Sequence, residues 1–328
     1  MLKKYYSPEK ILICGFGSIG ERYVKLLKEN WPESKVGVLT SKEINKIPSL
    51  FKIEFISDNL SDCIRWKPNA VIICNPATFH VDYAIEFLSV NIPVLIEKPL
   101  CTEEEQDSKL NTLETLSKSC PVLLGYVLRY DKAYSFLKDS LDNGDLGEVL
   151  KAKFYCSSWL PDWRGNKDYR KSVSSQKILG GGALLELSHE IDLAQSLLGQ
   201  IYLSSSILKN SGKLDIDVED IVLLRGRSTK CKQIFIELDF CSKKSERVTY
   251  LEAQNGSIKW DIENRYIEKN IYGKDKERIL LEKDTNHRFI NQITHFFECI
   301  NENITPLCGV KDGVIIIDII KKARELSF

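Results

Sequence analysis

The chain has 328 residues, and its 46 lysines and arginines balance 46 aspartates and glutamates, so its formal charge at pH 7 is zero. Apolar residues make up 43% and charged residues 28%, which is typical of a globular chain and argues against a disordered one. A neutral chain lacks the basic excess that a phosphate backbone attracts, so we expect no nucleic-acid partner. The length predicts about two domains.

Cysteine and hydropathy patterns bear on localisation. The sequence has no run of about 18 apolar residues, so we expect no membrane span and no membrane partner. The first apolar run, residues 11–14, is too short for the core of a signal peptide. None of the 10 cysteines forms a Cys-x-x-Cys pair, and only 4 histidines are present. We therefore expect reduced thiols, no metal site and a cytoplasmic protein.

The first 125 residues alternate between short apolar runs and stretches with helical spacing. The apolar runs predict strands at residues 10–14, 35–39, 53–56, 70–74, 93–96 and 122–124. Helices are predicted between them at 19–29, 59–66, 78–88 and 102–117, the last starting with a capping box formed by Thr102 and Glu105. This alternation predicts an α/β, doubly wound Rossmann domain with a parallel sheet over residues 1–125.

After residue 125 the pattern changes. A helix is predicted at 132–141, a strand at 148–156, a loop at 157–179, and a helix from the glycines 180–182 to Leu198, ended by Gly199. Strands then follow directly, at 201–208, 218–225, 233–240, 246–252, 257–261, 265–271 and 278–281, before helices at 287–301 and 311–326. We expect residues 126–328 to form an α+β domain for substrate binding and oligomerisation. It would have a large, mostly antiparallel open sheet, and its last helix would pack back toward the first domain.

A Gly-x-Gly-x-x-Gly motif lies between the first predicted strand and helix, as Gly15, Phe16, Gly17, Ser18, Ile19 and Gly20. In this context it predicts a dinucleotide site, because the glycines permit a tight turn, a close approach of pyrophosphate and close helix packing. Main-chain N–H groups at the start of the helix would face the anion. The alternative is a glycine turn without a ligand.

The end of the second predicted strand bears on the choice between NAD and NADP. It carries Thr40, Ser41 and Lys42 and no acidic residue at the tip. Hydroxyls and a cation suit a 2′-phosphate, which favours NADP. NAD stays open because Glu43 is near, and an acidic residue at this point would bind the ribose 2′-OH. Lys42 could also be a solvated loop lysine.

Polar residues follow the fourth and fifth predicted strands, where such sheets bind ligands. Asn75 and Pro76 would line the cofactor crevice, and Thr78 would cap the next helix. Glu97 and Lys98 end a strongly apolar strand, where a partly desolvated amine can exchange protons near neutral pH. The alternatives are a plain Asn-Pro turn and a surface Glu97–Lys98 ion pair.

These residues together resemble the Gfo/Idh/MocA family, the glucose–fructose oxidoreductase and inositol dehydrogenase group. The segments that carry the resemblance are residues 15–20, Asn75-Pro76 with His80, Glu97-Lys98-Pro99, Arg129-Tyr130 and 180–192. The resemblance implies NAD(P)-dependent oxidation or reduction of a sugar-like carbinol, with His80 and Glu97 in the cofactor site and Lys98 as the proton-transfer residue. It also implies homodimers or homotetramers that pack through the open face of the second sheet.

By the same resemblance His189 is a second catalytic residue. Glu186 precedes it by three residues, where family members often have an aspartate at four. If residues 183–198 form one helix, both spacings share a face, so Glu186 could orient the imidazole. Asp192 could serve instead. The alternative is that His189 is a structural helix histidine.

The Glu-Leu-Ser-His-Glu form of residues 186–190 and the preceding loop at 157–179 resemble a subgroup tied to bacterial surface polysaccharide biosynthesis. The loop suits an oxygen-rich substrate such as an acidic or nucleotide-linked sugar, because aromatic rings cover sugar C–H surfaces and arginines bind carboxylates or phosphates in a forked geometry. The substrate candidates in this loop are Trp163, Arg164, Tyr169 and Arg170. Arg129 and Asp192, which lie outside the loop, are two further candidates. Alternatively the tryptophans anchor the loop to the core and Arg129 is structural.

The function predicted from the sequence is hydride transfer between nicotinamide and a carbinol or ketone of a sugar derivative. Two alternatives stay open at this point. The first is a non-catalytic NAD(P)-binding redox sensor, and the second is an enzyme that holds NAD tightly for internal redox chemistry.

Overall fold

The protein is represented by a computed structural model that describes residues 7–42, 48, 51–165 and 167–327, without the side chain of Arg164. The chain divides into two units: residues 1–127 with 286–314, and residues 128–285 with 315–328. The predicted boundary at residue 125 lies close to the first crossing between the units. This division differs from the predicted one, because residues 286–314 group with the first unit, where α8 (Asn286–Glu302) packs on α1 (Ser18–Asn30).

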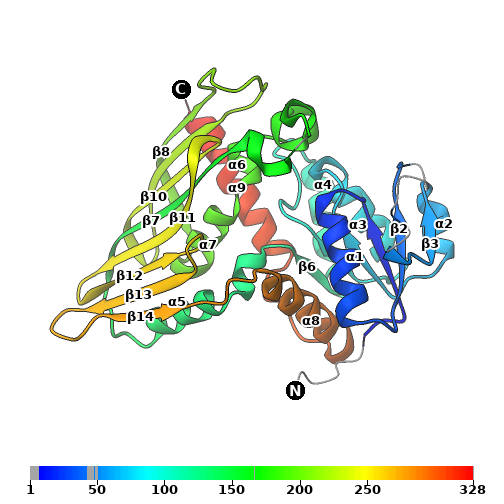
Figure 1. The fold of residues 1–328 in the computed structure, drawn as a ribbon, viewed down its shortest axis with the longest axis horizontal. Coiled ribbons are helices and arrows are strands. Elements are labelled where there is room, and N and C mark those ends of the chain that lie inside the picture. The colour runs from blue at the N-terminus through cyan, green and yellow to red at the C-terminus, as the bar shows by residue number, and fades with distance from the viewer. Residues whose placement is uncertain (1–6, 43–47, 49–50, 166, 328) are drawn as a thin grey trace. The chain divides into compact units, whose positions relative to one another are not determined.

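A six-stranded parallel sheet forms the centre of the first unit, in the order β3-β2-β1-β4-β5-β6 (Figure 1). Its strands are β1 (Lys10–Cys14), β2 (Lys35–Leu39), β3 (Phe55–Ser57), β4 (Ala70–Ile73), β5 (Val94–Ile96) and β6 (Val122–Leu124). The interior strands are continuous runs of buried apolar residues, which suits a sheet covered on both faces. The predicted doubly wound Rossmann domain is confirmed.

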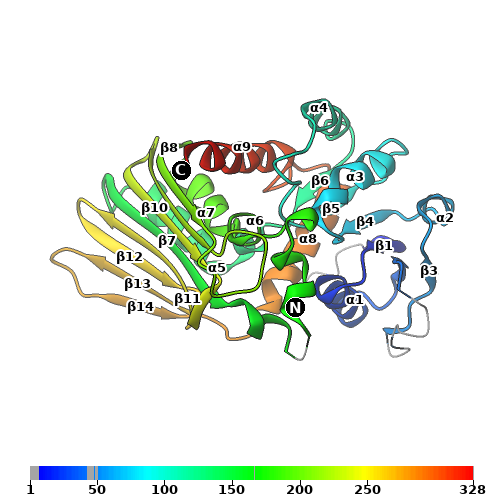
Figure 2. The same ribbon diagram turned by 90° about the horizontal axis from the view of Figure 1, so that it is seen from above.

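Helices cover both faces of this sheet. On one side lie α1 and α8, and on the other lie α3 (His80–Leu88) and α4 (Asp107–Leu116), as Figure 2 shows. The unit also contains α2 (Leu60–Arg65) and the first turn of α9 (Val310–Leu326). All the carboxyl ends of the parallel strands therefore face the same edge of the sheet, where the predicted cofactor residues follow β1, β2, β4 and β5.

Two predicted helix caps are wrong. The helix predicted from Thr102 begins at Asp107 with Gln106 in front of it, and the carboxylate of Glu105 accepts the N–H of Gln106 at 3.0 Å. Thr78 lies inside a 3₁₀ turn, η3 (Ala77–Phe79), that begins after Pro76 and leads directly into α3. No side chain caps α3, so the polar residue in front of it is not an N-cap.

An eight-stranded sheet dominates the second unit, in the order β14-β13-β12-β11-β7-β10-β9-β8. Only the β7–β10 pairing is parallel, so the predicted mostly antiparallel open sheet is confirmed. The strands are β7 (Val149–Trp159), β8 (Ile201–Lys209), β9 (Ile221–Ser228), β10 (Cys231–Asp239), β11 (Cys241–Ala253), β12 (Gly256–Asp261), β13 (Tyr266–Ile271) and β14 (Glu277–Leu280).

Helices cover one face of this sheet, as α5 (Lys132–Asp142), α6 (Ala183–Glu186), α7 (His189–Leu198) and the later part of α9 (Figure 2). The prediction of a single helix from residue 183 to 198 is wrong. The chain turns at Leu187 and Ser188, where the hydrogen bonds Ser188 N–Leu185 O and Glu190 N–Leu187 O have three-residue spacing. His189 is therefore the first residue of its own helix.

The predicted loop at 157–179 is shorter than expected and more ordered. β7 continues to Trp159, and four 3₁₀ turns follow it, η5 (Leu160–Arg164), η6 (Tyr169–Lys171), η7 (Val173–Ser175) and η8 (Lys177–Leu179). Single turns of this kind use local hydrogen bonds instead of a repeating helix. The segment therefore has a defined main-chain path without long regular elements.

Candidate functional site

The glycine loop after β1 has the geometry that its motif predicts. Gly15 has φ +98°, and a Cβ added there would lie 2.7 Å from the main-chain nitrogen of Asn75. A Cβ on Gly20 would lie 2.1 Å from the carbonyl oxygen of Gly15, whereas one on Gly17 would meet nothing within 4 Å. Two of the glycines are thus required by the fold. Gly17 is required only if something else approaches the loop.

The first turn of α1 begins directly after Gly17, at this open space. Ser18 and Ile19 begin the helix after Gly17, which caps it without a side-chain hydrogen bond. Phe16 is buried and packs edge-on against Phe51, with ring centroids 5.7 Å apart. An uncapped helix start with a glycine in front of it is a suitable place for an anion.

The end of β2 presents a cation beside the glycine loop. The amine of Lys42 lies 3.3 Å from the carboxylate of Glu21, and 5.2 Å from the centre of the Phe16 ring. The Lys42 N–H is donated to the hydroxyl of Thr40 at 3.1 Å, and Ser41 lies exposed between them. Glu43, the residue that left NAD open, lies outside the described residues.

His80 connects the chain segments that follow β4 and β5. Its ring is buried, with Nδ1 2.8 Å from the carbonyl of Pro99 and Nε2 2.8 Å from the carbonyl of Asn75. Burial lowers the pKa of His80, and these two carbonyl contacts oppose that effect. Both ring nitrogens thus contact main-chain carbonyls, and the cofactor contact of His80 stays a prediction.

Asn75 itself keeps an unused group. Within the described part of the chain, its buried Oδ1 has no hydrogen-bond partner. Asn75 and Pro76 follow β4, and the close approach of Asn75 to Gly15 places both at the ends of neighbouring strands. A buried amide oxygen without a partner is costly unless a ligand or water satisfies it.

Glu97 and Lys98 follow β5, the next strand of the sheet. Glu97 is only 8% exposed, which excludes the surface ion pair. Its carboxylate accepts the hydroxyl of Tyr23 at 2.6 Å and the main-chain N–H of Lys98 at 3.2 Å. The carboxylate of Glu97 thus has two partners inside the first unit, and its cofactor contact stays a prediction. Lys98 is half-buried, at the strand end where the sequence placed it.

Tyr23 was not among the residues predicted from the sequence. It lies on α1, 74 residues before Glu97, and its position in the helix has the spacing of an ordinary core residue. No local pattern distinguishes a core tyrosine whose hydroxyl has a specific carboxylate partner from one that only packs.

The second unit holds the other predicted catalytic residues. His189 begins α7 and is half-buried, and Glu186 ends α6. Because a turn separates the two helices, the argument that both side chains share one helix face does not apply. The carboxylate of Glu186 accepts the hydroxyl of Ser174 at 3.1 Å. Glu186 as the residue that orients His189 stays a prediction.

Arg129 and Asp192 bind each other in the interior of the second unit. The guanidinium donates to the carboxylate at 2.6 Å through Nη2 and at 3.1 Å through Nε. The side chains are 4% and 0% exposed. This geometry favours the structural interpretation of Arg129 over a substrate contact. Asp192 has Arg129 as an internal partner, and its contact with substrate stays a prediction.

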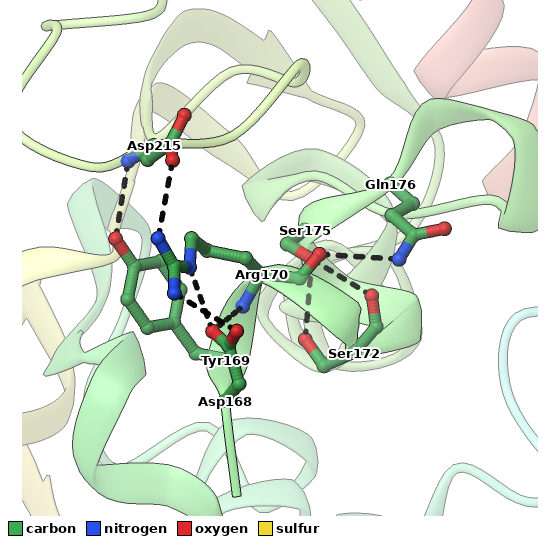
Figure 3. A network of polar contacts seen from close by, with 7 residues as sticks. All are labelled: Asp168, Tyr169, Arg170, Ser172, Ser175, Gln176 and Asp215. Carbon is green, nitrogen blue, oxygen red and sulfur yellow. Dashed lines mark hydrogen bonds and ion pairs between the residues drawn. The ribbon is translucent and has the colours of Figure 1, made fainter.

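The loop arginine Arg170 has an internal partner as well (Figure 3). Its guanidinium forks onto Asp168, with Nε–Oδ1 at 2.8 Å and Nη2–Oδ2 at 3.0 Å, and lies 3.6 Å from Asp215. The hydroxyl of Tyr169 accepts the N–H of Asp215 at 3.1 Å. The fork predicted for a substrate acid is thus made to Asp168, and the network fastens this segment to residues near 215.

Trp163 fits both interpretations of the loop, an anchor to the core and a surface for substrate. Its indole N–H donates to Ser158 at 2.9 Å, and its ring packs edge-on against Phe240 with centroids 5.1 Å apart. The residue is still 37% exposed. It is anchored to the core and also presents part of its ring to solvent. The side chain of Arg164 lies outside the described part of the structure.

The residues of the first unit fit a dinucleotide. The open space above Gly17, the uncapped start of α1 and the unsatisfied oxygen of Asn75 lie at adjacent strand ends of one parallel sheet. Pyrophosphate would lie on the glycine loop, and the remaining polar groups would meet the cofactor further along the edge. This arrangement can bind an anionic dinucleotide beside the amine of Lys98.

The described ranges also bear on a metal site and on a membrane span. No group of three or more histidine, cysteine, aspartate or glutamate side chains is arranged there to hold a metal ion. No helix in the same ranges combines the length and apolar character needed to cross a membrane.

Family models match both units. Residues 9–126 match a model described as "Oxidoreductase family, NAD-binding Rossmann fold", and residues 134–258 match the "GFO/IDH/MocA C-terminal domain". Inositol 2-dehydrogenase of Pseudomonas syringae pv. syringae is 22% identical over 236 residues, which are 70% of this chain and 67% of the relative. Inositol 2-dehydrogenase 1 of Mycolicibacterium vanbaalenii is 25% identical over 260 residues, 76% and 71% of the two chains.

Solved structures share the fold. Levoglucosan dehydrogenase in complex with NADH and L-sorbose superposes with a TM-score of 0.83 at 16% identity, covering 97% of each chain. myo-Inositol 2-dehydrogenase of Lactobacillus plantarum gives a TM-score of 0.82 at 19% identity, covering 98% of this chain and 97% of the other. At such identities the similarity establishes the two-domain architecture.

Proposed function

Because the chain belongs to the Gfo/Idh/MocA family of NAD-binding oxidoreductases, we propose that it transfers hydride between nicotinamide and a carbinol or ketone of a sugar or polyol. The observation that carries this proposal is the position of Lys98. This half-buried residue follows β5, in the same sheet and at the same edge as the glycine loop after β1. Ligands of open α/β sheets bind at this edge.

When bound on the glycine loop, NAD(P) would supply the acceptor for the hydride of the carbinol carbon in the oxidation direction. The hydroxyl proton of the substrate must leave as the carbonyl forms, and the neutral amine of Lys98 takes it. In the reduction direction the ammonium of Lys98 returns that proton to the alkoxide oxygen. We assign His189 the role of supporting or sharing this transfer, and Glu186 that of orienting His189.

The substrate class rests on two kinds of support. Relatives are inositol 2-dehydrogenases, and the structural neighbours include levoglucosan dehydrogenase, so a ring with several hydroxyl groups is the class we propose. The narrower proposal is an acidic or nucleotide-linked sugar of surface polysaccharide biosynthesis. It is supported by the loop of Trp163 and Arg170, in which Arg170 keeps 56% of its side chain exposed despite its bond to Asp168.

For the cofactor, the family description gives NAD binding, and a preference for NADP is the finer proposal. It is supported by the hydroxyls of Thr40 and Ser41 and by the amine of Lys42 at the end of β2. Glu21 opposes it, because its carboxylate already lies 3.3 Å from that amine.

We also propose a homodimer or homotetramer formed through the uncovered face of the second sheet. Large apolar side chains are exposed on its strands, and the described examples are Leu150, Tyr202, Ile207 and Leu223. Single exposed apolar residues are common, but several on one sheet indicate a contact surface. A cytoplasmic location is proposed from the cysteines, since all ten are free thiols, as in proteins of a reducing compartment.

The test is the change in NAD(P)H absorbance with a panel of inositols, anhydrosugars, free sugars and sugar nucleotides. Wild-type protein should turn over at least one of them, and Lys98→Met should reduce kcat by about a hundredfold or more, the usual contribution of a general acid–base. Lys118→Met, at an exposed lysine of the same unit, is the control.

Three outcomes would contradict parts of the proposal. Turnover that Lys98→Met leaves unchanged would disprove the role of Lys98. Cofactor binding without turnover on any member of the panel would favour a redox sensor. Copurification of NAD that dialysis does not remove would favour internal redox chemistry.

A further inference from the structure

Tyr23 connects the helix of the glycine loop to the strand end that carries Lys98. Its ring is fully buried on α1, and its hydroxyl donates to Oε1 of Glu97 at 2.6 Å. Phe289 of α8 packs edge-on against this ring, with centroids 5.7 Å apart. The ring has little room to turn, so the hydroxyl has a fixed direction.

Glu97 uses its two carboxylate oxygens for two different donors. Oε1 accepts the hydroxyl of Tyr23, and Oε2 accepts the main-chain N–H of Lys98 at 3.2 Å. Gly125 leaves the space that this carboxylate occupies, because a Cβ there would lie 2.9 Å from the Cα and 3.0 Å from Oε2 of Glu97. The carboxylate is therefore confined between neighbouring strand ends.

We propose that Tyr23 is a positioning residue for Lys98, acting through the carboxylate of Glu97. The hydroxyl of Tyr23 holds that carboxylate in place, the carboxylate holds the Lys98 main chain, and the main chain sets the direction of the amine. This inference rests on the proposed function, in which Lys98 moves the substrate proton.

An ionised carboxylate suits these two hydrogen bonds best. Burial raises the pKa of Glu97, whereas the hydrogen bond from Tyr23 lowers it. Once protonated, the carboxyl group has an O–H in place of one acceptor and is less suited to accept both donors. Removing the Tyr23 hydroxyl therefore makes Glu97 take up a proton at a higher pH, and the support for Lys98 is lost in the same pH range.

The first experiment compares Tyr23→Phe with Tyr83→Phe on the full chain. Phenylalanine keeps the contact with Phe289 and removes only the hydroxyl. We expect Tyr23→Phe to lower kcat about tenfold, to leave the Kd for NAD within about twofold of wild type, and to move the acid limb of the kcat–pH profile to higher pH. Tyr83, a half-buried tyrosine of α3 in the same unit, should give wild-type values.

The second experiment does not depend on turnover. Acetic anhydride labels lysine amines, and mass spectrometry gives the rate at Lys98 relative to Lys118 in the same molecule. Tyr23→Phe should label faster at Lys98, because the amine loses its fixed direction. Tyr83→Phe should not, and adding Glu97→Gln to Tyr23→Phe should produce little further change, since both variants break the same connection.

The outcomes separate this inference from the proposed function. If wild-type protein turns over a carbinol and Tyr23→Phe matches it in kcat and pH profile, Tyr23 does not position Lys98, and the proposed function stands. If no carbinol is turned over, the proposed function fails. The labelling rate then decides alone: a faster rate supports the connection from Tyr23 to Lys98, and an unchanged rate overturns it.

Discussion

The guanidinium of Arg129 and the carboxylate of Asp192 form an ion pair that is almost completely removed from solvent. Asp192 lies in the first turn of α7, three residues after His189, and Arg129 lies in the 3₁₀ turn η4 (Val127–Tyr130) that follows β6. The two side chains are 4% and 0% exposed, so the pair lies in a low-dielectric environment. Either charge alone would be strongly destabilising there. The pair therefore fixes the start of α7, the helix that carries His189.

We predict that Asp192→Asn destabilises the protein by about 3–5 kcal/mol, because it leaves the buried charge of Arg129 without its balancing carboxylate. The double variant Arg129→Met/Asp192→Leu should lose less, since neither charge remains. Urea unfolding measures both. Lys132→Met, which breaks the exposed pair with Glu282, is the control and should cost at most about 1 kcal/mol. Equal losses for Asp192→Asn and Lys132→Met would contradict the prediction.

His80 predicts a pH dependence of stability. Because burial lowers the pKa of His80, the unfolded chain takes up this proton at a higher pH than the folded chain. The contribution of His80 is therefore complete above its unfolded pKa of about 6.5 and is lost as pH falls below it, by at most about 1.4 kcal/mol per pH unit.

The measurement is unfolding by urea between pH 8 and pH 5 for wild type and His80→Gln. Glutamine does not titrate, so the stability difference between the two proteins should shrink as pH falls. His295→Gln is a comparison, because burial lowers the pKa of His295 as well and its effect should add independently. A difference that stays constant over this range would disprove the assignment to His80.

The glycine loop predicts that substitutions at two of its glycines affect protein stability and cofactor binding differently. Gly17→Ala should leave the free energy of unfolding within about 0.5 kcal/mol of wild type, because its Cβ meets nothing within 4 Å. It should weaken NAD binding by at least about tenfold, since the methyl group enters the space for pyrophosphate. Gly20→Ala should instead lose stability, because its Cβ would lie 2.1 Å from the Gly15 carbonyl oxygen. Fluorescence titration with NADH and thermal unfolding test the two effects, and unchanged NADH binding in Gly17→Ala would place the cofactor elsewhere.

The pair of Lys42 and Glu21 predicts how the chain discriminates between NAD and NADP. Removing the carboxylate in Glu21→Gln should strengthen NADP binding relative to NAD, because the amine of Lys42 becomes available to a 2′-phosphate. Lys42→Gln should shift the ratio of the two Kd values in the opposite direction. Each change should be about three- to fivefold, as the pair is exposed and weak. Identical ratios in all three proteins would show that Lys42 does not contact the 2′ position.

Local sequence predicted the first unit well. The strands β1, β2 and β6 have the predicted bounds, since continuous apolar runs that end at glycine, threonine and glycine mark buried parallel strands. The glycine motif has the turn and the close contacts that its spacing predicts. These features depend on neighbouring residues, so a local pattern is sufficient to find them. The break between α6 and α7 was missed because both helices keep an apolar, helix-like spacing across the turn.

Sequence alone thus determined the sheet of the first unit, the position of the glycine loop and the place of Lys98 at a strand end. Tertiary structure decided which side chains are the partners of the buried charged groups. Glu97 binds Tyr23 from 74 residues away, and Arg129 binds Asp192 from 63 residues away. A buried charge is stable only beside a partner that the folded chain brings close to it. Neither periodicity nor spacing along the chain predicts which residue that partner is.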